Sequence, residues 1–410
     1  MKEKLFTRYE VFMITVLSFL QFTIVLDFIV LSPLSAVLMP ALKIKPAQFG
    51  MVVSAYAFSA GISGLLAAGF ADKFDRKKML LFFYAGFIIG TLLCALAPDY
   101  KFLMAARIVT GLFGGVISAI SFAIITDLFR MEVRGRVMGF VQSAFAASQV
   151  LGVPVGLFLA DRWGWHATFL MIVVISTVVG IFMVIYIKPI DAHLQIKSER
   201  KPFQHLMKTI SAVPYLKAFA ATTLLATGGF MLMPFASAYG VNNLGIPFSK
   251  FQLVYFVTGI FSVACGPLIG KLSDVIGKYK VFVVGSIWSI IIVLIYCNLG
   301  VTPLWLFMLI SVLMFVGVSS RMISSSALLT AIPLPQDRGA FMSINSAVQQ
   351  ISGGIATAIA GMIIVQRTET SALENYDILG FVVVGAMTLT IFMMYFIHRD
   401  ITAKTQPQAA

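Results

Sequence analysis

Acidic side chains are scarce in this sequence, and only one of them is predicted to lie deep within a long apolar stretch. The chain of 410 residues contains 17 Asp and Glu, and all charged residues together make up 11% of it. A soluble domain carries about 25% charged residues. The chain therefore lacks the charged surface that a water-soluble protein needs, and its composition instead suits a surface that faces lipid.

The sequence also lacks the residue patterns of common enzymes and metal proteins. Its three cysteines lie far apart, and its four histidines fall in loops or at the ends of predicted helices. This spacing fits no metal motif and no disulfide framework. No Gly-Lys-Ser or Gly-Lys-Thr phosphate loop occurs, which argues against ATP as an energy source. We therefore expect neither an enzyme, nor a metal site, nor a bound cofactor.

Long apolar runs dominate the sequence instead. Hydrophobic residues make up 59% of the chain, and its mean hydropathy is +0.95. Stretches of about 20 apolar residues match the thickness of a bilayer core, and a backbone in lipid satisfies its hydrogen bonds by forming helices. The sequence predicts an all-α membrane protein. Its twelve expected transmembrane helices lie at about 10–39, 47–71, 77–98, 100–126, 134–160, 165–188, 213–243, 248–271, 279–298, 303–330, 338–365 and 377–398.

The basic residues behind the net charge of +13 are distributed as this membrane topology predicts. With both termini placed in the cytoplasm, 22 of the 30 Lys and Arg fall in cytoplasmic segments and 6 in outer loops. This excess agrees with the positive-inside rule. No basic run with interleaved aromatic residues stands alone as a nucleic-acid surface. We therefore expect cytoplasmic termini and no nucleic-acid partner.

Asp27 is the acid predicted to lie in the middle of a membrane helix. A charged side chain there costs about 2.5–3.5 kcal/mol on insertion scales, and such residues usually have a function. Burial favours the neutral acid, whereas a nearby arginine favours the carboxylate, so the two effects can hold the group near its switching point. We predict that Asp27 binds a proton and that Arg107, in the fourth predicted helix, tunes it.

The helical rise places Asp27 about 18 Å and Arg107 about 10 Å below the outer ends of their helices. The long arginine side chain or a bridging water would close this gap. The alternatives are a structural bond from Arg107 to helix carbonyls and a silent hydrogen bond of Asp27 to a neighbouring Ser or Thr.

The chain contains an internal repeat of about half its length. The segment around Asp72 recurs around Asp274, 202 residues later, and Pro33 matches Pro234 at a spacing of 201. Parallel six-helix halves with a site at their interface near the midplane are a known transporter design. The predicted organisation is an N-terminal six-helix bundle (1–188), a cytoplasmic linker (189–212), a C-terminal six-helix bundle (213–398) and a cytoplasmic tail (399–410).

The repeated loop resembles the signature of a known family. The segments Ala68–Leu80 and Gly270–Lys280 are similar to the loop between helices two and three of the major facilitator superfamily, although Asp75 stands where the first loop usually has glycine. In that family this loop links helix two to neighbouring helices through a charge relay. The resemblance implies conformational gating by Asp72, Arg76, Lys77, Asp127, Asp274, Gly277 and Lys278.

Three further stretches resemble the 12-helix drug:proton antiporters of this superfamily. Leu103–Gly115, with Arg107, is similar to the helix-four motif of proton-coupled members. Leu26-Asp27 followed by Pro33 loosely resembles the acidic helix-one motif. Gly139–Gly156 partly matches the helix-five motif associated with antiporters, with its glycines one position early. The residues that carry the helix-five resemblance are Gly152, Pro154 and Gly156.

Residues on helices one, four, five, seven and ten are candidates for a substrate cavity. Arg321 lies among five serines in the tenth helix, where we expect it to bind an anionic substrate group. The alternative for Arg321 is snorkelling to the cytoplasmic surface or bonding to helix ends. The expected cavity residues are Gln21, Phe22, Gln149, Phe230, Met233, Phe235 and Arg321.

These features favour a proton-coupled secondary transporter that exports drugs or amphiphilic small molecules by alternating access. A symporter or facilitator of a sugar, nucleoside or organic anion is the alternative, since two buried arginines stand against one acid. A lipid-handling transporter or a membrane sensor is a third possibility. The expected partners are a small-molecule substrate, protons and the lipid bilayer. We expect a monomeric, multi-pass protein of the bacterial cytoplasmic (inner) membrane.

Overall fold

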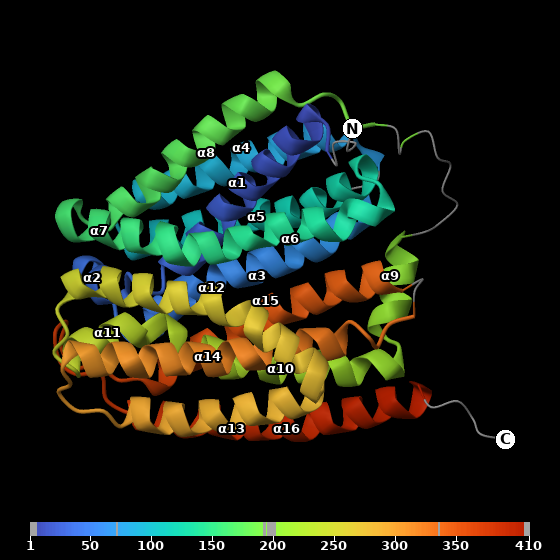
Figure 1. The fold of residues 1–410 in the computed structure, drawn as a ribbon. Coiled ribbons are helices and arrows are strands. Elements are labelled where there is room, and N and C mark those ends of the chain that lie inside the picture. Colours follow the sequence, from blue (N-terminus) through green and yellow to red (C-terminus); the bar gives the residue numbers. More distant parts are fainter. Residues whose placement is uncertain (1–5, 71–72, 192–193, 195–201, 335–336, 406–410) are drawn as a thin grey trace.

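The chain folds into long helices that run side by side (Figure 1). The computed structural model describes residues 6–70, 73–191, 194, 202–334 and 337–405, and one isolated β-bridge occurs among them, between Val365 and Glu374. The helices are α1 (Arg8–Val30), α2 (Ser35–Leu42), α3 (Pro46–Phe70), α4 (Arg76–Ala95), α5 (Tyr100–Leu128), α6 (Met131–Ala147), α7 (Val153–Trp163), α8 (His166–Tyr186), α9 (Pro202–Ile210), α10 (Val213–Phe230), α11 (Ala236–Asn242), α12 (Phe251–Ile276), α13 (Lys278–Cys297), α14 (Leu304–Leu329), α15 (Arg338–Ile363) and α16 (Tyr376–Thr405).

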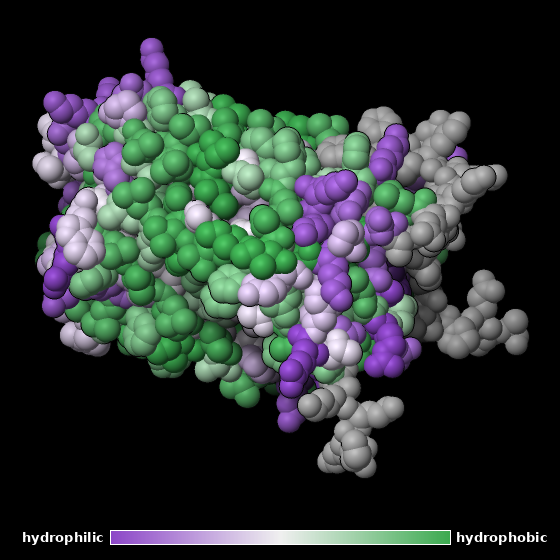
Figure 2. All heavy atoms as spheres, turned by 90° about the horizontal axis from the view of Figure 1, so that it is seen from above, coloured by the Kyte–Doolittle hydropathy of each residue, from purple (hydrophilic) through white to green (hydrophobic). Residues whose placement is uncertain are grey.

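Eleven helical segments of the described chain are long and apolar enough to cross a membrane. The predicted span 338–365 corresponds to α15, which is long enough at 26 residues but is not among the eleven. Its sequence is more polar, because it carries Asn345, Gln349 and Gln350. Figure 2 shows the matching surface, on which a hydrophobic belt separates two more hydrophilic ends. The protein is therefore all-helical and multi-pass, and the twelfth span stays a prediction.

The structure adds detail to two parts of the predicted organisation. The predicted cytoplasmic linker, 189–212, contains α9, which packs against α3 and α15. The helix α9 puts apolar residues such as Leu206 into a cluster with Tyr215 and Phe341, which stabilises a helix there. The predicted tail begins inside α16, since that helix continues to Thr405.

Prolines divide the first and seventh predicted spans at matching places. A turn over residues 31–34, at Pro33, separates α1 from α2, and a short 3₁₀ turn, Met233–Phe235, separates α10 from α11. Proline lacks the amide hydrogen that an α-helix needs and clashes with the preceding turn, so such breaks are expected. The repeat seen in the sequence thus produces the same local structure twice.

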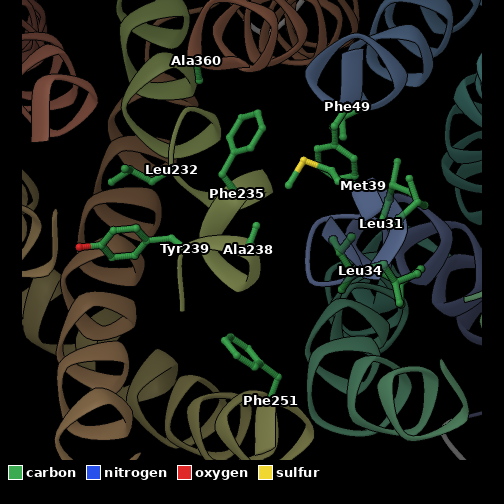
Figure 3. Packing of buried hydrophobic residues seen from close by; sticks show 14 of the residues in the cluster. Leu31, Leu34, Met39, Phe49, Leu232, Phe235, Ala238, Tyr239, Phe251 and Ala360 are labelled. Atoms are coloured by element: carbon green, nitrogen blue, oxygen red, sulfur yellow. The ribbon is translucent and has the colours of Figure 1, made fainter. Parts of the chain in front are cut away.

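The first and second halves of the chain lie on opposite sides and meet along the middle (Figure 1). One buried apolar cluster joins them at the end of the molecule that carries α2 and α11. Figure 3 shows Phe235 from the second half facing Met39 and Phe49 from the first. The rings of Phe49 and Phe235 meet edge to face, with their centroids 5.8 Å apart.

Small residues allow α3 and α15 to pack closely along much of their length. A side chain at Gly361 would overlap the backbone at Pro46, and one at Gly50 would come within 2.9 Å of the carbonyl oxygen of Thr357. In addition, the Ser54 hydroxyl donates a hydrogen bond of 2.7 Å to the carbonyl oxygen of Gly354. Close backbone approach through small residues is the usual basis of helix association in lipid.

The substitution Gly115→Ala should destabilise the protein. A methyl group at Gly115, on α5, would overlap the backbone of Ala60 on α3. Overpacking of this kind typically costs about 1–3 kcal/mol. The same change at Gly139, on α6, meets no atom within 4 Å among the described residues and serves as the matched control. Thermal unfolding of the detergent-purified variants should show a lower midpoint for Gly115→Ala alone, and equal midpoints would contradict this packing.

Candidate functional site

Asp27 lies near the end of α1 and is completely buried. The proline-containing turn that follows ends the helix one turn later and leaves Asp27 facing the helices α4 and α5. Its side chain touches polar groups on both of these helices. The sequence predicts this burial correctly.

Arg107 and Asp27 form a direct ion pair inside the helix bundle. An Nη1 hydrogen of Arg107, on α5, is donated to Oδ2 of Asp27 over 2.7 Å, and the two side chains are 1% and 0% exposed. The Thr91 hydroxyl, on α4, donates a weaker bond of 3.3 Å to the other carboxylate oxygen. Asp27 and Arg107 were expected at different depths along their helices. The arginine side chain itself spans this difference, without a bridging group.

The guanidinium of Arg107 also lies over an aromatic ring. Its Cζ atom is 4.4 Å from the ring centroid of Tyr56, on α3. The Nε atom of Arg107 is buried and has no hydrogen-bond partner in the described part of the chain. A cation over a tyrosine face is stabilised even without an anion, by about 0.5–2 kcal/mol depending on desolvation. Tyr56 can thus hold Arg107 in place when the carboxylate is neutral.

Thr91 and Tyr56 belong to this site, yet nothing in the sequence singled them out. Both are ordinary residues in apolar helices, and their role depends on the rotation of α3 and α4 about their axes. Gly111, one turn beyond Arg107 on α5, lies so close to α3 that an added side chain would overlap the backbone of Tyr56. This close approach brings the tyrosine ring to the arginine.

The predicted helix-five motif contains an irregular turn that packs on α1. Residues Ser148–Gly152 form a π-helical turn between α6 and α7. Such turns are frequent at functional sites. The Ser148 hydroxyl donates to the carbonyl oxygen of Phe22 over 3.0 Å, and Gly152 faces Phe22 and Leu26. The turn therefore touches the helix that carries Asp27.

Pro154 and Gly156 continue this contact in α7. Pro154 lies in the first turn of α7, where the missing amide hydrogen costs little. The Gly156 carbonyl accepts a hydrogen bond of 2.7 Å from Thr168 on α8. A side chain at Gly156 would crowd Thr168 and Val30. The two predicted motif glycines therefore serve close packing of α7 against α1 and α8.

The predicted cavity residues of the first half lie near this turn. Gln21 is nearly buried, and its side-chain oxygen accepts a long hydrogen bond of 3.4 Å from Ser118 on α5. Phe22 and Gln149 are partly exposed. Of the three, Gln149 lies in the π-helical turn itself. Gln21 thus faces α5, and Phe22 lies beside the π-helical turn that contains Gln149.

The predicted cavity residues of the second half differ in exposure. Phe230 is partly exposed at the end of α10, and its ring lies 5.9 Å from that of Phe28 on α1. Met233 is partly buried, and Phe235 is fully buried in the apolar contact between the halves. Phe235 therefore presents no surface to a ligand in this conformation, because the end of the molecule around α2 and α11 is closed.

Arg321 does not snorkel to a surface. Its side chain on α14 is 3% exposed, and its Nε atom donates a hydrogen bond of 3.2 Å to Ser286 on α13. The Nη2 atom of Arg321 and the Ser324 hydroxyl are buried without partners among the described residues. The serine that bonds Arg321 is therefore on α13 and is none of the five serines around it on α14, and this single bond leaves the cation incompletely satisfied.

The predicted gating loops differ between the two halves. Asp72 lies outside the described residues. Arg76, at the start of α4, donates from Nε to Asp127 near the end of α5 over 3.0 Å. Lys77 donates to the carbonyl oxygen of Val184 on α8 over 3.3 Å. These two contacts link α4 to α5 and α8, and the expected relay to helix two and the gating role stay predictions.

Asp75 and Gly277 occupy the corresponding turns differently. Asp75 was expected to replace a glycine of a tight turn, but its φ of −55° is ordinary and its side chain caps α4 by accepting bonds from the Lys77 and Lys78 amides. Gly277 has a φ of 108°, which only glycine adopts readily. Lys278 begins α13 after it, and Asp274 is exposed with no ion pair within the described chain.

The pair Arg76 and Asp127 should contribute measurably to folding or transport. Asp127→Arg places two cations together and should lower both the folded yield and the transport rate. The double variant Arg76→Asp with Asp127→Arg restores opposite charges at 3.0 Å and should recover a large part of the loss, as coupled neighbours do. Expression and transport of the single and double variants measure this coupling. Additive losses would show that the ion pair is dispensable.

Comparisons with known proteins agree with this architecture. The sequence profile of the Major Facilitator Superfamily matches residues 17–242 and 218–410. The uncharacterized MFS-type transporter YceJ of Bacillus subtilis (strain 168) is 25% identical over 396 residues, which cover 94% of this chain and 97% of that protein. The multi-drug resistance efflux pump PmrA of Streptococcus pneumoniae (serotype 4) is 25% identical over 260 residues, which cover 61% and 63% of the two chains.

Solved structures share the fold. A bacterial homolog to the human lysosomal transporter Spinster, inward-facing and unoccupied, aligns with a TM-score of 0.79 at 14% identity, over 98% of this chain and 100% of that one. The nucleoside transporter NupG aligns with a TM-score of 0.74 at 13% identity, over 94% and 99% of the chains. Sequence identities this low are evidence for a shared fold and not for a shared function. Together with the family profile, they establish that the chain belongs to the Major Facilitator Superfamily and is a membrane transporter rather than an enzyme.

Proposed function

We propose that this transporter exports drugs or other amphiphilic small molecules in exchange for protons. The observation that carries the proposal is the ion pair of Asp27 and Arg107, which is fully buried inside the first six helices. A buried ion pair is often no more stable than well-packed apolar residues in its place. A fully buried pair is therefore better explained by a role in transport than by a contribution to stability.

The geometry around Asp27 suits a carboxyl group that gains and loses a proton. Its charged form is stabilised by Arg107 at 2.7 Å and by Thr91 at 3.3 Å, while complete burial opposes the charge. When a proton neutralises Asp27, the charge-assisted bond weakens. Arg107 then keeps its stacking over Tyr56. Protonation would thus change the link between α1 and α5 without leaving the arginine unsupported.

The contacts of α1 offer a route from this event to the second half. Phe28, next to Asp27, touches Phe230 on α10, and the π-helical turn that packs on α1 also packs on α12, where Val150 faces Gly259. Both contacts cross from one half of the chain to the other. A change in α1 would therefore reach the helices that must separate during alternating access.

We infer that the structure is a state closed toward the outside. The halves are held together at the end that carries α2 and α11, where Ser35 and Ser237 share a hydrogen bond of 2.8 Å. The distribution of Lys and Arg assigns this end to the outside. In the proposed cycle, substrate enters from the cytoplasm, a proton from outside displaces it, and the proton gradient supplies the energy without a cofactor.

The remaining details belong to the same proposal. The proposal includes bundles at 1–188 and 213–398, twelve spans, cytoplasmic termini, a monomeric state and the bacterial inner membrane. Export of drugs is favoured by the partial identity to the efflux pump PmrA. A symporter or facilitator of a small metabolite is the second candidate, which the incompletely paired Arg321 favours.

The test is ethidium efflux from bacterial cells that lack their main efflux pumps. Cells that express the chain should expel preloaded ethidium faster than cells with an empty vector, and an uncoupler should remove this difference. The uncoupler collapses the gradient on which the proposed exchange depends. Equal efflux with and without the chain, at verified membrane expression, would reject drug export. It would favour the second candidate, a transporter of a small metabolite.

A further inference from the structure

The second half of the chain lacks a counterpart of Asp27. The prolines that break the two repeated spans, Pro33 and Pro234, are 201 residues apart, and the same offset takes Asp27 to Gly228. Gly228 lies on α10 and is buried, as Asp27 is on α1. The repeat therefore replaces Asp27, the only buried acid among the described residues of the first half, by a residue with no side chain.

An arginine nevertheless faces this position. A Cβ atom built on Gly228 would lie 3.5 Å from Nη1 and 3.6 Å from Nη2 of Arg321. In the first half the equivalent residue, Asp27, pairs with Arg107. The repeat does not align Arg107 with Arg321. The second half thus brings a different arginine to the same turn of the equivalent helix, but without the carboxylate.

The guanidinium of Arg321 is consequently buried with too few partners. Its Nε atom donates to Ser286, and its Nη2 atom has no hydrogen-bond partner in the part of the chain that the structure describes. No acidic side chain of the described residues pairs with it. A buried cation without an anion is unfavourable, because it loses its hydration and gains no compensating charge. An anionic group from outside the chain would remove this deficit.

The free atoms favour a carboxylate over a spherical anion. With Nε committed to Ser286, the two terminal nitrogens remain, and they form the planar fork that binds the two oxygens of a carboxylate. The unpartnered hydroxyl of Ser324 lies one helical turn from Arg321 on the same face of α14. The site therefore offers three hydrogen-bond donors, which are the two terminal nitrogens of Arg321 and the Ser324 hydroxyl. No negatively charged side chain of the described residues pairs with them.

We propose that Arg321 and Ser324, oriented by Ser286, bind the carboxylate of an organic anion or zwitterion that the protein transports. The site occupies the place where the second half lacks its own acid. This assignment rests on the proposed transport function and adds amphiphiles that carry a carboxylate to the proposed substrates, beside cations such as ethidium. The residues around Arg321 come from α10, α13, α14 and α16, so such a ligand would lie among helices of the second half.

The first experiment restores the missing acid. Gly228→Asp places a carboxylate within reach of Arg321, whereas Gly228→Asn adds a side chain of the same shape without the charge. The nearest other atom, Cγ of Met387 at 3.3 Å from the added Cβ, belongs to a flexible side chain. In thermal unfolding of the purified full chain, Gly228→Asp should unfold at a higher temperature than Gly228→Asn, and this difference should vanish in an Arg321→Gln background. An aspartate no more stable than the asparagine would overturn the proposal.

The second experiment supplies the carboxylate as a ligand. Sodium acetate and sodium benzoate are compared with the neutral amides acetamide and benzamide, and with sodium chloride at equal ionic strength, as stabilisers of the detergent-purified protein. A carboxylate should raise the unfolding temperature of the wild type beyond the chloride and amide values, and should fail to do so in Arg321→Gln and Gly228→Asp. The control Arg367→Gln makes the same change at an exposed arginine and should keep the effect.

The outcomes separate this site from the proposed transport. Equal effects of carboxylate and chloride, or a carboxylate effect that survives Arg321→Gln, would overturn the carboxylate site. Both measurements are made without a membrane or a gradient, so they do not depend on proton coupling. Ethidium efflux that is insensitive to uncoupler, together with an intact carboxylate effect, would reject the export mechanism and leave the site standing.

Discussion

Replacing Asp27 by asparagine should abolish uncoupler-sensitive ethidium efflux while leaving the protein folded in the membrane. Asparagine has nearly the same shape and can still accept a hydrogen bond from Arg107, but it cannot take up a proton. Without that step the proton gradient cannot drive the exchange. Efflux from cells that express the variant should therefore fall to the rate of the empty vector, and it should show no further response to an uncoupler.

The control for this prediction is Thr91→Val. It removes the hydroxyl that donates to Asp27 over 3.3 Å but keeps the acid and its pair with Arg107. A bond of this length is the weaker of the two bonds to Asp27, so efflux should fall far less than in Asp27→Asn and should stay sensitive to the uncoupler. Removal of one partner of a buried pair can cost about 3–5 kcal/mol of stability, so the amount of folded Asp27→Asn protein must be measured alongside. Proton-coupled efflux by well-folded Asp27→Asn would show that another group carries the proton.

Cross-linking the two halves at their closed end should stop transport completely. The hydroxyl oxygens of Ser35, in α2, and Ser237, in α11, lie 2.8 Å apart and are both buried. Cysteines at these positions are close enough for a disulfide to form with a small shift. The bond would tie the halves together at the end that must open to release substrate outside. Ethidium efflux by Ser35→Cys with Ser237→Cys should therefore vanish after oxidation and return after reduction.

The controls are the two single cysteine variants, which cannot form this bond. They should keep their activity under the oxidant, and they also report on the three native cysteines, of which Cys265 is the most accessible. Loss of free thiols in the double variant verifies that the bond has formed. An oxidised, cross-linked double variant that still transports would contradict opening at α2 and α11, and with it alternating access through this end.

Much of the fold was predictable from the sequence, because a bilayer imposes simple rules. Helix length is fixed by membrane thickness, and the backbone has no alternative to helical hydrogen bonding in lipid. The twelve predicted segments correspond to helical segments of the structure, whose ends differ by a few residues in most cases. The helix α9 was not predicted, because its short apolar face becomes favourable only against α3 and α15. The polar residue Asn345 of α15 likewise becomes understandable only from its neighbour Thr222 on α10, whose hydroxyl donates to it over 2.6 Å.

The candidate site was also predictable from the sequence only in part. Asp27 and Arg107 stand out in the sequence because a charge within an apolar stretch is costly wherever the helix lies. Thr91, Tyr56 and Ser286 do not stand out, because their importance depends on how each helix is rotated and how closely glycines let it approach. Gly228 could have been found from the 201-residue repeat, but its meaning required the position of Arg321.

The sequence by itself determined the membrane class, the repeat and the buried charges, since these follow from hydropathy and spacing along one chain. The tertiary structure alone decided which charges meet, because neighbours on different helices are set by packing between segments far apart in sequence. It joined Arg107 to Asp27 directly and left Arg321 facing a glycine. It also decided which end is closed, since the apolar cluster that includes Phe49 and Phe235 forms only when both halves come together.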